Sequence, residues 1–288
     1  MTDTLENLRH KIDGATELGS VVRTMKAVAA SSIGQYENAV AALEDYYRTV
    51  DLGLSVCFRQ KEKAAPSGKT DSDEILAVVF GSDQGLVGQF NDIVADFAVA
   101  KLASLRGKKS VWTVGDRMHS SLIDSGLPLT GQFALPTSIA AITPLIGQIV
   151  VMIDDQKIKT TELYLFYNRP KFGSVYEPVM QRLLPLDAKW QQERAALPWP
   201  TGNLPELIGD IEDALIREYL FISLFKACAE SLASENASRL AAMQRAEKNI
   251  DDLLEDLNST FHRLRQSSID EELFDVITGF EALSGPQT

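Results

Sequence analysis

The chain has 288 residues, 45% of them apolar and 24% charged, values typical of a globular protein and unlike those of a disordered one. Its formal net charge of -12 argues against non-specific nucleic-acid binding, which needs clustered Lys and Arg. No apolar run reaches about 18 residues, and the polar N-terminus lacks the features of a signal or import sequence. We therefore expect a cytoplasmic chain that inserts no segment of its own into a membrane.

The first predicted element is a long helix over residues 1–58. No proline occurs before Pro66, and apolar side chains recur at steps of three and four residues. Their mean spacing is about 3.5 residues, the period of a left-handed coiled coil. The predicted seam consists of Leu5, Leu8, Ile12, Ala15, Leu18, Val22, Met25 and Ala29. One apolar stripe on a helix needs a partner helix to cover it.

Residues 59–205 are predicted to form an α/β body. Residues 61–74 (KEKAAPSGKTDSDE) have the composition of an exposed loop, and Ile75–Phe80 (ILAVVF) is typical of a strand buried on both faces. Further along we expect helices at 89–105, 117–125 and 138–153, strands at 110–114, 162–167 and 175–184, and a turn at 168–174. Strands that alternate with helices indicate an open sheet, here ending in a hairpin.

A second long helix is predicted within residues 206–288. No proline lies between Pro205 and Pro286, and a helix over residues 206–283 would be about 115 Å long. Its predicted seam consists of Leu240, Met243, Ala246, Ile250, Leu253, Leu257, Phe261 and Leu264. We therefore predict a mixed fold, α+β or α/β, in which the N- and C-terminal helices form a long antiparallel coiled coil beside a central, Rossmann-like open sheet.

One loop has the position of a phosphate-binding loop. Gly81–Gly88 (GSDQGLVG) follows a predicted strand and precedes a predicted helix. It lacks the G-x-G-x-x-G pattern, and glycines also serve simply to turn the chain. A nucleotide-binding enzyme stays an alternative, as does a free coiled-coil scaffold. Because the three histidines and two cysteines form no metal-ligand or nucleophile pattern, we expect no metal, no cofactor and a mechanical role.

Three regions resemble the gamma subunit of rotary F-type ATP synthases. Val21–Ser32 (VVRTMKAVAASS) is similar to the family's I-T-x-A-M-x-M-V-A-A-S-K. Ser82–Asn91 (SDQGLVGQFN) is similar to S-D-[RK]-G-L-C-G-x-[FY]-N. In the last helix, Ser231–Met243 (SLASENASRLAAM) and Arg265–Leu273 (RQSSIDEEL) are similar to S-L-A-S-E-x-x-A-R-M-x-A-M and R-Q-x-x-I-T-x-E-L. The resemblance covers both ends and the middle of the chain.

The resemblance implies a non-catalytic rotor that couples ion flow through a membrane c ring to ATP synthesis or hydrolysis on beta subunits. Its implied partners are the alpha, beta and epsilon subunits and the c ring, on the cytoplasmic side of the bacterial inner membrane. The matched positions imply rotor–stator contacts at Met25, Arg239, Arg265, Gln266 and Glu272, and a body-domain turn shaped by Asp83, Gly85 and Gly88.

The chain departs from the family pattern at several positions. After Ser32 the family has a basic stretch that is missing here, and Asp270 stands where threonine is common. Gln84 and Val87 replace a basic residue and a cysteine. These differences suggest a divergent bacterial branch, such as the alternative, sodium-type ATPases, with fewer positive charges toward the catalytic subunits.

Overall fold

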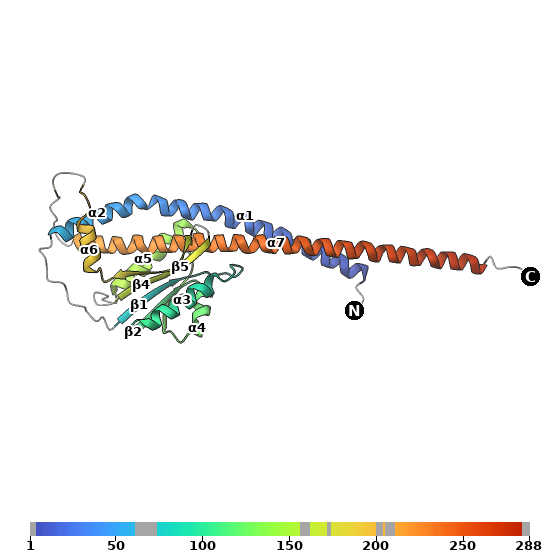
Figure 1. Cartoon of the computed structure of the whole chain (residues 1–288), viewed down its shortest axis with the longest axis horizontal. Coiled ribbons are helices and arrows are strands. Elements are labelled where there is room, and N and C mark those ends of the chain that lie inside the picture. Colours follow the sequence, from blue (N-terminus) through green and yellow to red (C-terminus); the bar gives the residue numbers. More distant parts are fainter. Residues whose placement is uncertain are drawn as a thin grey trace, which may run out of the picture. The chain divides into compact units, whose positions relative to one another are not determined.

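The computed structural model describes residues 4–60, 74–155, 162–171, 174–199, 204 and 211–283. The chain divides into two compact units, Ala29–Arg239 in one and Met1–Val28 with Leu240–Thr288 in the other. Helices α1 (Leu5–Ala42) and α7 (Ile211–Leu283) each continue through both units (Figure 1). With 73 residues, α7 is about 110 Å long, which confirms the predicted C-terminal helix. Most of the predicted linker at 61–74 lies outside the described residues.

A five-stranded sheet in the order β3-β2-β1-β4-β5 forms the centre of the unit Ala29–Arg239. β1 pairs in parallel with β2 and β4, β2 pairs in parallel with β3, and β4 pairs antiparallel with β5. In this register Val78 lies opposite Trp112 of β2 and Leu165 of β4. The strands are β1 (Glu74–Phe80), β2 (Lys108–Val114), β3 (Leu129–Phe133), β4 (Glu162–Lys171) and β5 (Ser174–Leu184). The predicted open sheet with a terminal hairpin is confirmed.

Different helices cover the two faces of this sheet (Figure 1). The odd-numbered residues of β1 pack in a cluster with α3 (Phe90–Ser104) and α4 (Asp116–Ile123). The even-numbered residues of β1 pack in a cluster with α5 (Ile139–Asp155) and with α7. Since both sets of side chains are buried, β1 is a continuous apolar run rather than an alternating one.

The N-terminal helical region consists of two helices, so the single helix expected over residues 1–58 is wrong. α1 ends at Ala42, and α2 (Glu44–Gln60) begins after a turn at Leu43. The Leu43 amide donates to the carbonyl of Val40, three residues back, at 3.1 Å. A tighter bond of this kind interrupts the regular helical ladder. No proline or glycine marks the position in the sequence.

Two short elements are absent from the sequence-based prediction. β3 contains Gly131 and alternates exposed with partly covered side chains, so it has little of the apolar character of the inner strands. α6 (Ala188–Ala195) begins after Asp187, whose carboxylate accepts the Trp190 amide at 2.7 Å as an N-cap. Arg59 of α2 donates to the carbonyl of Ala195, the last residue of α6, and to that of Leu197 just beyond it, so the end of this helix also depends on a tertiary contact.

The hairpin begins later than predicted. β4 continues as a strand through Lys171, so Asn168–Lys171 are not part of a turn, and only residues 172–173 separate β4 from β5. Asn168 lies opposite Pro178, and Arg169 opposite Glu177. The Arg169–Glu177 ion pair, at 2.7 Å, contributes to extending the pairing beyond the apolar part of the strand.

In the unit of residues 1–28 and 240–288, α1 and α7 form the predicted antiparallel coiled coil. A Cβ added to Gly19 would lie 3.4 Å from Ile250 Cγ2, and Lys26 Nζ lies 2.5 Å from Glu247 Oε2. Positions later in α1 therefore meet positions earlier in α7. Buried residues recur at heptad intervals along α1, at Leu8, Ala15 and Val22.

Two predicted seam residues lie outside the seam. Leu18 is 54% exposed and Leu253 is 49% exposed, whereas their neighbours Gly19 and Leu254 are buried or partly buried. The buried and partly buried residues of the observed seam are separated by three and four residues in strict alternation. The predicted stripe contained two consecutive spacings of three residues. A one-residue error turns a side chain by about 100° around a helix, which is enough to move it from the seam to the surface.

Candidate functional site

The loop Gly81–Gly88 joins β1 to α3 at the carboxyl end of the parallel strands. A side chain is excluded at Gly81, because its Cβ would lie 2.4 Å from Met118 Cβ. Gly88 has φ 59°, in the left-handed region that favours glycine. Gly85 has more space, since the nearest atom to an added Cβ would be 3.8 Å away. The loop therefore owes its shape to Gly81 and Gly88 more than to Gly85.

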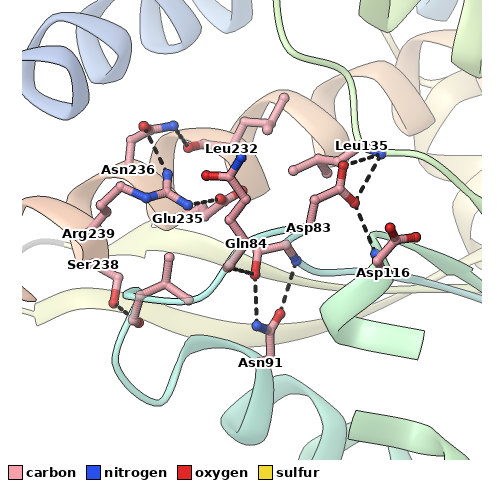
Figure 2. A network of polar contacts seen from close by, with 12 residues as sticks. Asp83, Gln84, Asn91, Asp116, Leu135, Leu232, Glu235, Asn236, Ser238 and Arg239 are labelled. Atoms are coloured by element: carbon pink, nitrogen blue, oxygen red, sulfur yellow. Dashed lines mark hydrogen bonds and ion pairs between the residues drawn. The ribbon is translucent and has the colours of Figure 1, made fainter. Parts of the chain in front are cut away.

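Asp83 connects the ends of three neighbouring strands (Figure 2). Its Oδ1 accepts the amide of Asp116 after β2 at 2.9 Å, and its Oδ2 accepts the amide of Leu135 after β3 at 3.2 Å. A carboxylate only accepts hydrogen bonds, so backbone amides can satisfy it without a cation. Asp83 thus fixes the edge of the sheet from which the loop projects.

Ser82 and Asn91 close the loop on itself. The Ser82 amide donates to Asn91 Oδ1 at 2.9 Å, and Asn91 Nδ2 donates to Ser82 Oγ at 2.8 Å. Ser82 Oγ in turn donates to the Gln84 carbonyl at 2.9 Å. A phosphate-binding loop keeps its amides directed at the ligand, whereas here the Ser82 amide is engaged internally. This geometry favours a structural loop over a nucleotide site.

Helix α7 is attached to the same loop by side chains of its central segment (Figure 2). Ser238 Oγ donates to the carbonyl of Val87 at 2.6 Å. At the next residue, Arg239 Nη2 lies 2.5 Å from Glu235 Oε1, and Arg239 Nη1 donates to Asn236 Oδ1 at 3.4 Å. Only 14% of the Arg239 side chain and 4% of the Glu235 side chain are exposed. The charge of Arg239, a predicted contact residue, is therefore directed at its own helix.

The Glu235 carboxyl lies in an unusual electrostatic environment. Burial, the largest effect, raises its pKa above the usual range for glutamate, and the charge of Asp83 acts in the same direction. The charge and hydrogen bond of Arg239 oppose this effect without cancelling it. The sequence indicated no such role, because glutamate on a long helix is usually a solvated surface residue.

Met25 lies in the coiled coil, in the other compact unit. It is partly buried and packs against a cluster formed by Val22, Met243 and Ile250. The next residue, Lys26, pairs with Glu247 across the two helices. Met25 therefore has a packing role in the seam and still presents part of its surface outward.

The remaining predicted contact residues lie near the end of α7. Arg265, Gln266 and Glu272 are all exposed, as is every residue from Ile269 to Phe280. Apolar side chains are common in this stretch: Ile269, Leu273, Phe274, Val276, Ile277 and Phe280 are 45% to 71% exposed. Isolated exposed apolar residues are ordinary, but a run of them along one helix marks a surface that another protein can cover.

Sequence reasoning singled out Asp83 and Arg239 but not the residues that hold them in place. The roles of Asp116, Leu135 and Glu235 follow from the tertiary structure alone. Asn91 could have been found from the sequence, because an amide side chain just after a strand–loop segment can bond the loop's own backbone.

The sequence model of the family described as ATP synthase matches residues 4–283. The chain belongs to the ATP synthase family. The ATP synthase gamma chain of Dechloromonas aromatica is 27% identical over 285 residues, which covers 96% of this chain and 99% of that protein.

Two solved structures support the fold of this family member. A chain of the Euglena gracilis mitochondrial ATP synthase rotor, in rotational state 1, has a TM-score of 0.64 at 16% identity, covering 92% of this chain and 98% of that one. A chain of the same enzyme's OSCP/F1/c-ring structure, in rotational state 3, has a TM-score of 0.66 at 16% identity. The match covers 99% of this chain and 97% of that one. At this identity the likeness concerns the fold.

Within the part of the chain that the structure describes, no group of three or more His, Cys, Asp or Glu side chains could hold a metal ion. Among the same residues, no helix is long and apolar enough to cross a membrane. The arrangement can instead hold a long helix firmly against the edge of a sheet.

Proposed function

We propose that the chain is the gamma-type central-stalk rotor of an F-type ATP synthase, a non-catalytic subunit. It couples ion flow through a c ring to ATP synthesis or hydrolysis on beta subunits. The observation that carries the proposal is the family match over residues 4–283, which includes all 73 residues of α7. Two similarities support it, one to the gamma chain of Dechloromonas aromatica and one to the fold of a chain in the Euglena gracilis rotor.

The physical properties of α7 suit a shaft. A helix of this length cannot be enclosed by a compact domain, and pairing with α1 stiffens its middle part. Its last described part, Ile269–Phe280, is exposed and rich in apolar side chains, as expected of a segment covered by surrounding subunits. Rotation of an asymmetric shaft presents different faces to each catalytic site in turn and shifts the site between conformations by differential contact.

The proposed rotor–stator contacts are on the outer surfaces of the two long helices. Arg265, Gln266 and Glu272 are exposed and free of the coiled-coil cluster, and Met25 presents its uncovered side. Arg239 would be touched only at its outer edge, because most of its side chain is buried. We propose Met25 and Arg239 as contacts that also have a packing role.

The proposed functional parts are the segments 1–58, 59–205 and 206–288. They differ from the compact units because α1 and α7 each run through both units. The two terminal segments contact the alpha and beta subunits, and the α/β body, with its turn at Asp83, Gly85 and Gly88, contacts the epsilon subunit and the c ring. The chain is then peripheral, on the cytoplasmic side of the bacterial membrane.

Reconstitution with alpha and beta subunits tests this function. We expect the chain to co-purify with them and to restore cooperative ATP hydrolysis, and absence of co-purification contradicts the proposal. Phe280→Asp, at a side chain 71% exposed on α7, should weaken assembly. Ile123→Asp, at a side chain 58% exposed on α4, is the matched control and should assemble normally. Calorimetric binding of ATP to the isolated chain would favour the nucleotide-binding alternative.

A further inference from the structure

Glu235 is buried in the middle of α7 with one carboxyl oxygen unsatisfied. Its Oε1 accepts a hydrogen bond from Arg239 Nη2 at 2.5 Å. Its Oε2 is buried and has no hydrogen-bond partner among the described residues. An ionised carboxylate oxygen left without a donor in the protein interior is unfavourable. A proton on Oε2 removes this charge, and a neutral carboxyl is less costly to bury than an ionised one.

The groups that face Glu235 come from several elements. Arg239 and Cys228 lie on α7 itself, Asp83 lies in the loop after β1, and Tyr36 lies on α1. Burial, and next the charge of Glu235, raise the pKa of both Tyr36 and Cys228, so these two groups stay neutral. Among the described residues, the charged groups that act on the Glu235 carboxyl are the Asp83 carboxylate and the Arg239 guanidinium. If both carboxyls were ionised, the buried site would hold a net negative charge.

We propose that Glu235 keeps a proton in the folded protein and, in this form, is a positioning residue that holds α7 against the loop Gly81–Gly88. Ser238, three residues further on, lies on the same face of the helix and bonds the loop at Val87. The Ser238 hydroxyl is the bond of this joint between the long helix and the loop, and a neutral Glu235 carboxyl beside it avoids charge repulsion with Asp83. The mechanical consequence rests on the proposed function, since the joint would transmit rotation of the body to α7.

Loss of the proton weakens this joint for an electrostatic reason. The ionised Glu235 would repel Asp83, whose own position is fixed by the amides of Asp116 and Leu135. Because Asp83 cannot easily move away, the repulsion acts on the contact between helix and loop. The Ser238 bond then remains as the contact that holds the two together.

The first experiment measures urea unfolding of the full chain from pH 5 to 9, for the wild type and Glu235→Gln. The folded pKa is raised above the unfolded one, so the wild type binds the proton more tightly when folded. The wild type should therefore lose stability relative to Glu235→Gln as pH rises. The ratio of the wild-type unfolding constant to that of Glu235→Gln should rise by up to about tenfold per pH unit. A ratio that stays constant, or that falls as pH rises, overturns the proposal.

A second variant keeps the test decisive if Glu235→Gln does not fold. Asp83→Asn removes the neighbouring negative charge, so the pH-dependent loss of stability should move to lower pH, because the repulsion that raises the Glu235 pKa is gone. An unchanged pH profile in Asp83→Asn overturns the proposed interaction of the two carboxyls.

The second experiment measures ion transport per ATP hydrolysed in the reconstituted complex. Glu235→Ala should lower this ratio at least twofold, and Glu235→Gln should preserve it. The matched control is Glu230→Gln, at a second buried glutamate of α7: burial raises its pKa, and the groups that act against this effect are Lys226, Tyr167 and Arg169, none of them in the loop. Normal coupling in Glu235→Ala overturns the positioning role. Failure of the wild-type chain itself to assemble overturns the proposed function instead.

Discussion

Replacement of Ile250 by alanine tests the seam of the coiled coil. Ile250 is 7% exposed and packs with Val22 and Met243. The change removes three carbon atoms, worth about 0.8 kcal/mol each, or about 2.5 kcal/mol of burial. Alanine regains about 0.4 kcal/mol through its higher helix propensity, so we expect a net loss of about 2 kcal/mol.

Leu253→Ala is the matched control on the same helix. Sequence periodicity placed Leu253 in the seam, but its side chain is 49% exposed in the structure. Since about half of its apolar surface is already in water, we expect a loss below about 1 kcal/mol. The comparison of the two variants therefore tests which residues face α1, and not simply whether α7 is helical.

Amide hydrogen exchange of the full chain, followed by mass spectrometry, measures the local effect. Residues 240–265 should exchange about thirtyfold faster in Ile250→Ala and less than about fivefold faster in Leu253→Ala, because every 1.4 kcal/mol changes a local opening constant about tenfold. Peptides from β1 and β2 belong to the other compact unit and should be unchanged. Equal acceleration in the two variants, or faster exchange in the sheet, would refute the assigned seam.

Three further outcomes follow from the structure. Gly81→Ala should lower the free energy of unfolding by about 1–3 kcal/mol in urea titrations, because its Cβ would overlap Met118; an unchanged midpoint would contradict this. Met25→Lys should lower ion transport per ATP hydrolysed more than it lowers the yield of assembled complex, and an equal loss of both would mean that Met25 only packs in the seam. Burial, and a hydrogen bond to Glu162, raise the pKa of Tyr164 to about 12 from 10.0. The folded state thus holds this proton more tightly than the unfolded state, so the free energy of unfolding should fall as pH rises between the two pKa values. In Tyr164→Phe the slope of this free energy against pH should be smaller by the equivalent of about one proton. Urea unfolding at pH 9 to 11 measures the slope.

The main elements of the fold could be predicted because they follow from local patterns. The apolar run Ile75–Phe80 predicted a strand buried on both faces, and β1 has this environment. The proline-free region after Pro205 predicted a single long helix, which α7 confirms over its described residues. The turn at Leu43 and the helix α6 could not be predicted in this way. The first has no sequence marker, and the second depends partly on Arg59 from a distant helix.

The candidate site was predictable only in part. A motif placed Asp83 and Gly88 in a turn, and the structure gives Asp83 two amide donors and Gly88 a left-handed conformation. The motif at Ser231–Met243 includes Glu235 but gave it no role, because that role comes from burial and from a loop about 150 positions earlier in the chain. The predicted contacts at Arg265 and Glu272 stay predictions, since they concern other subunits.

The sequence by itself determined that two long helices at the ends of the chain each carry one apolar stripe, on either side of an α/β body. Backbone geometry and side-chain period are local properties, so they can be seen in any short window. The tertiary structure alone decided that Gly19, and not Leu18, faces Ile250, and that Glu235 lies beside Asp83. Register and burial depend on how distant segments pack together, and a shift of one residue changes which side chain is inside.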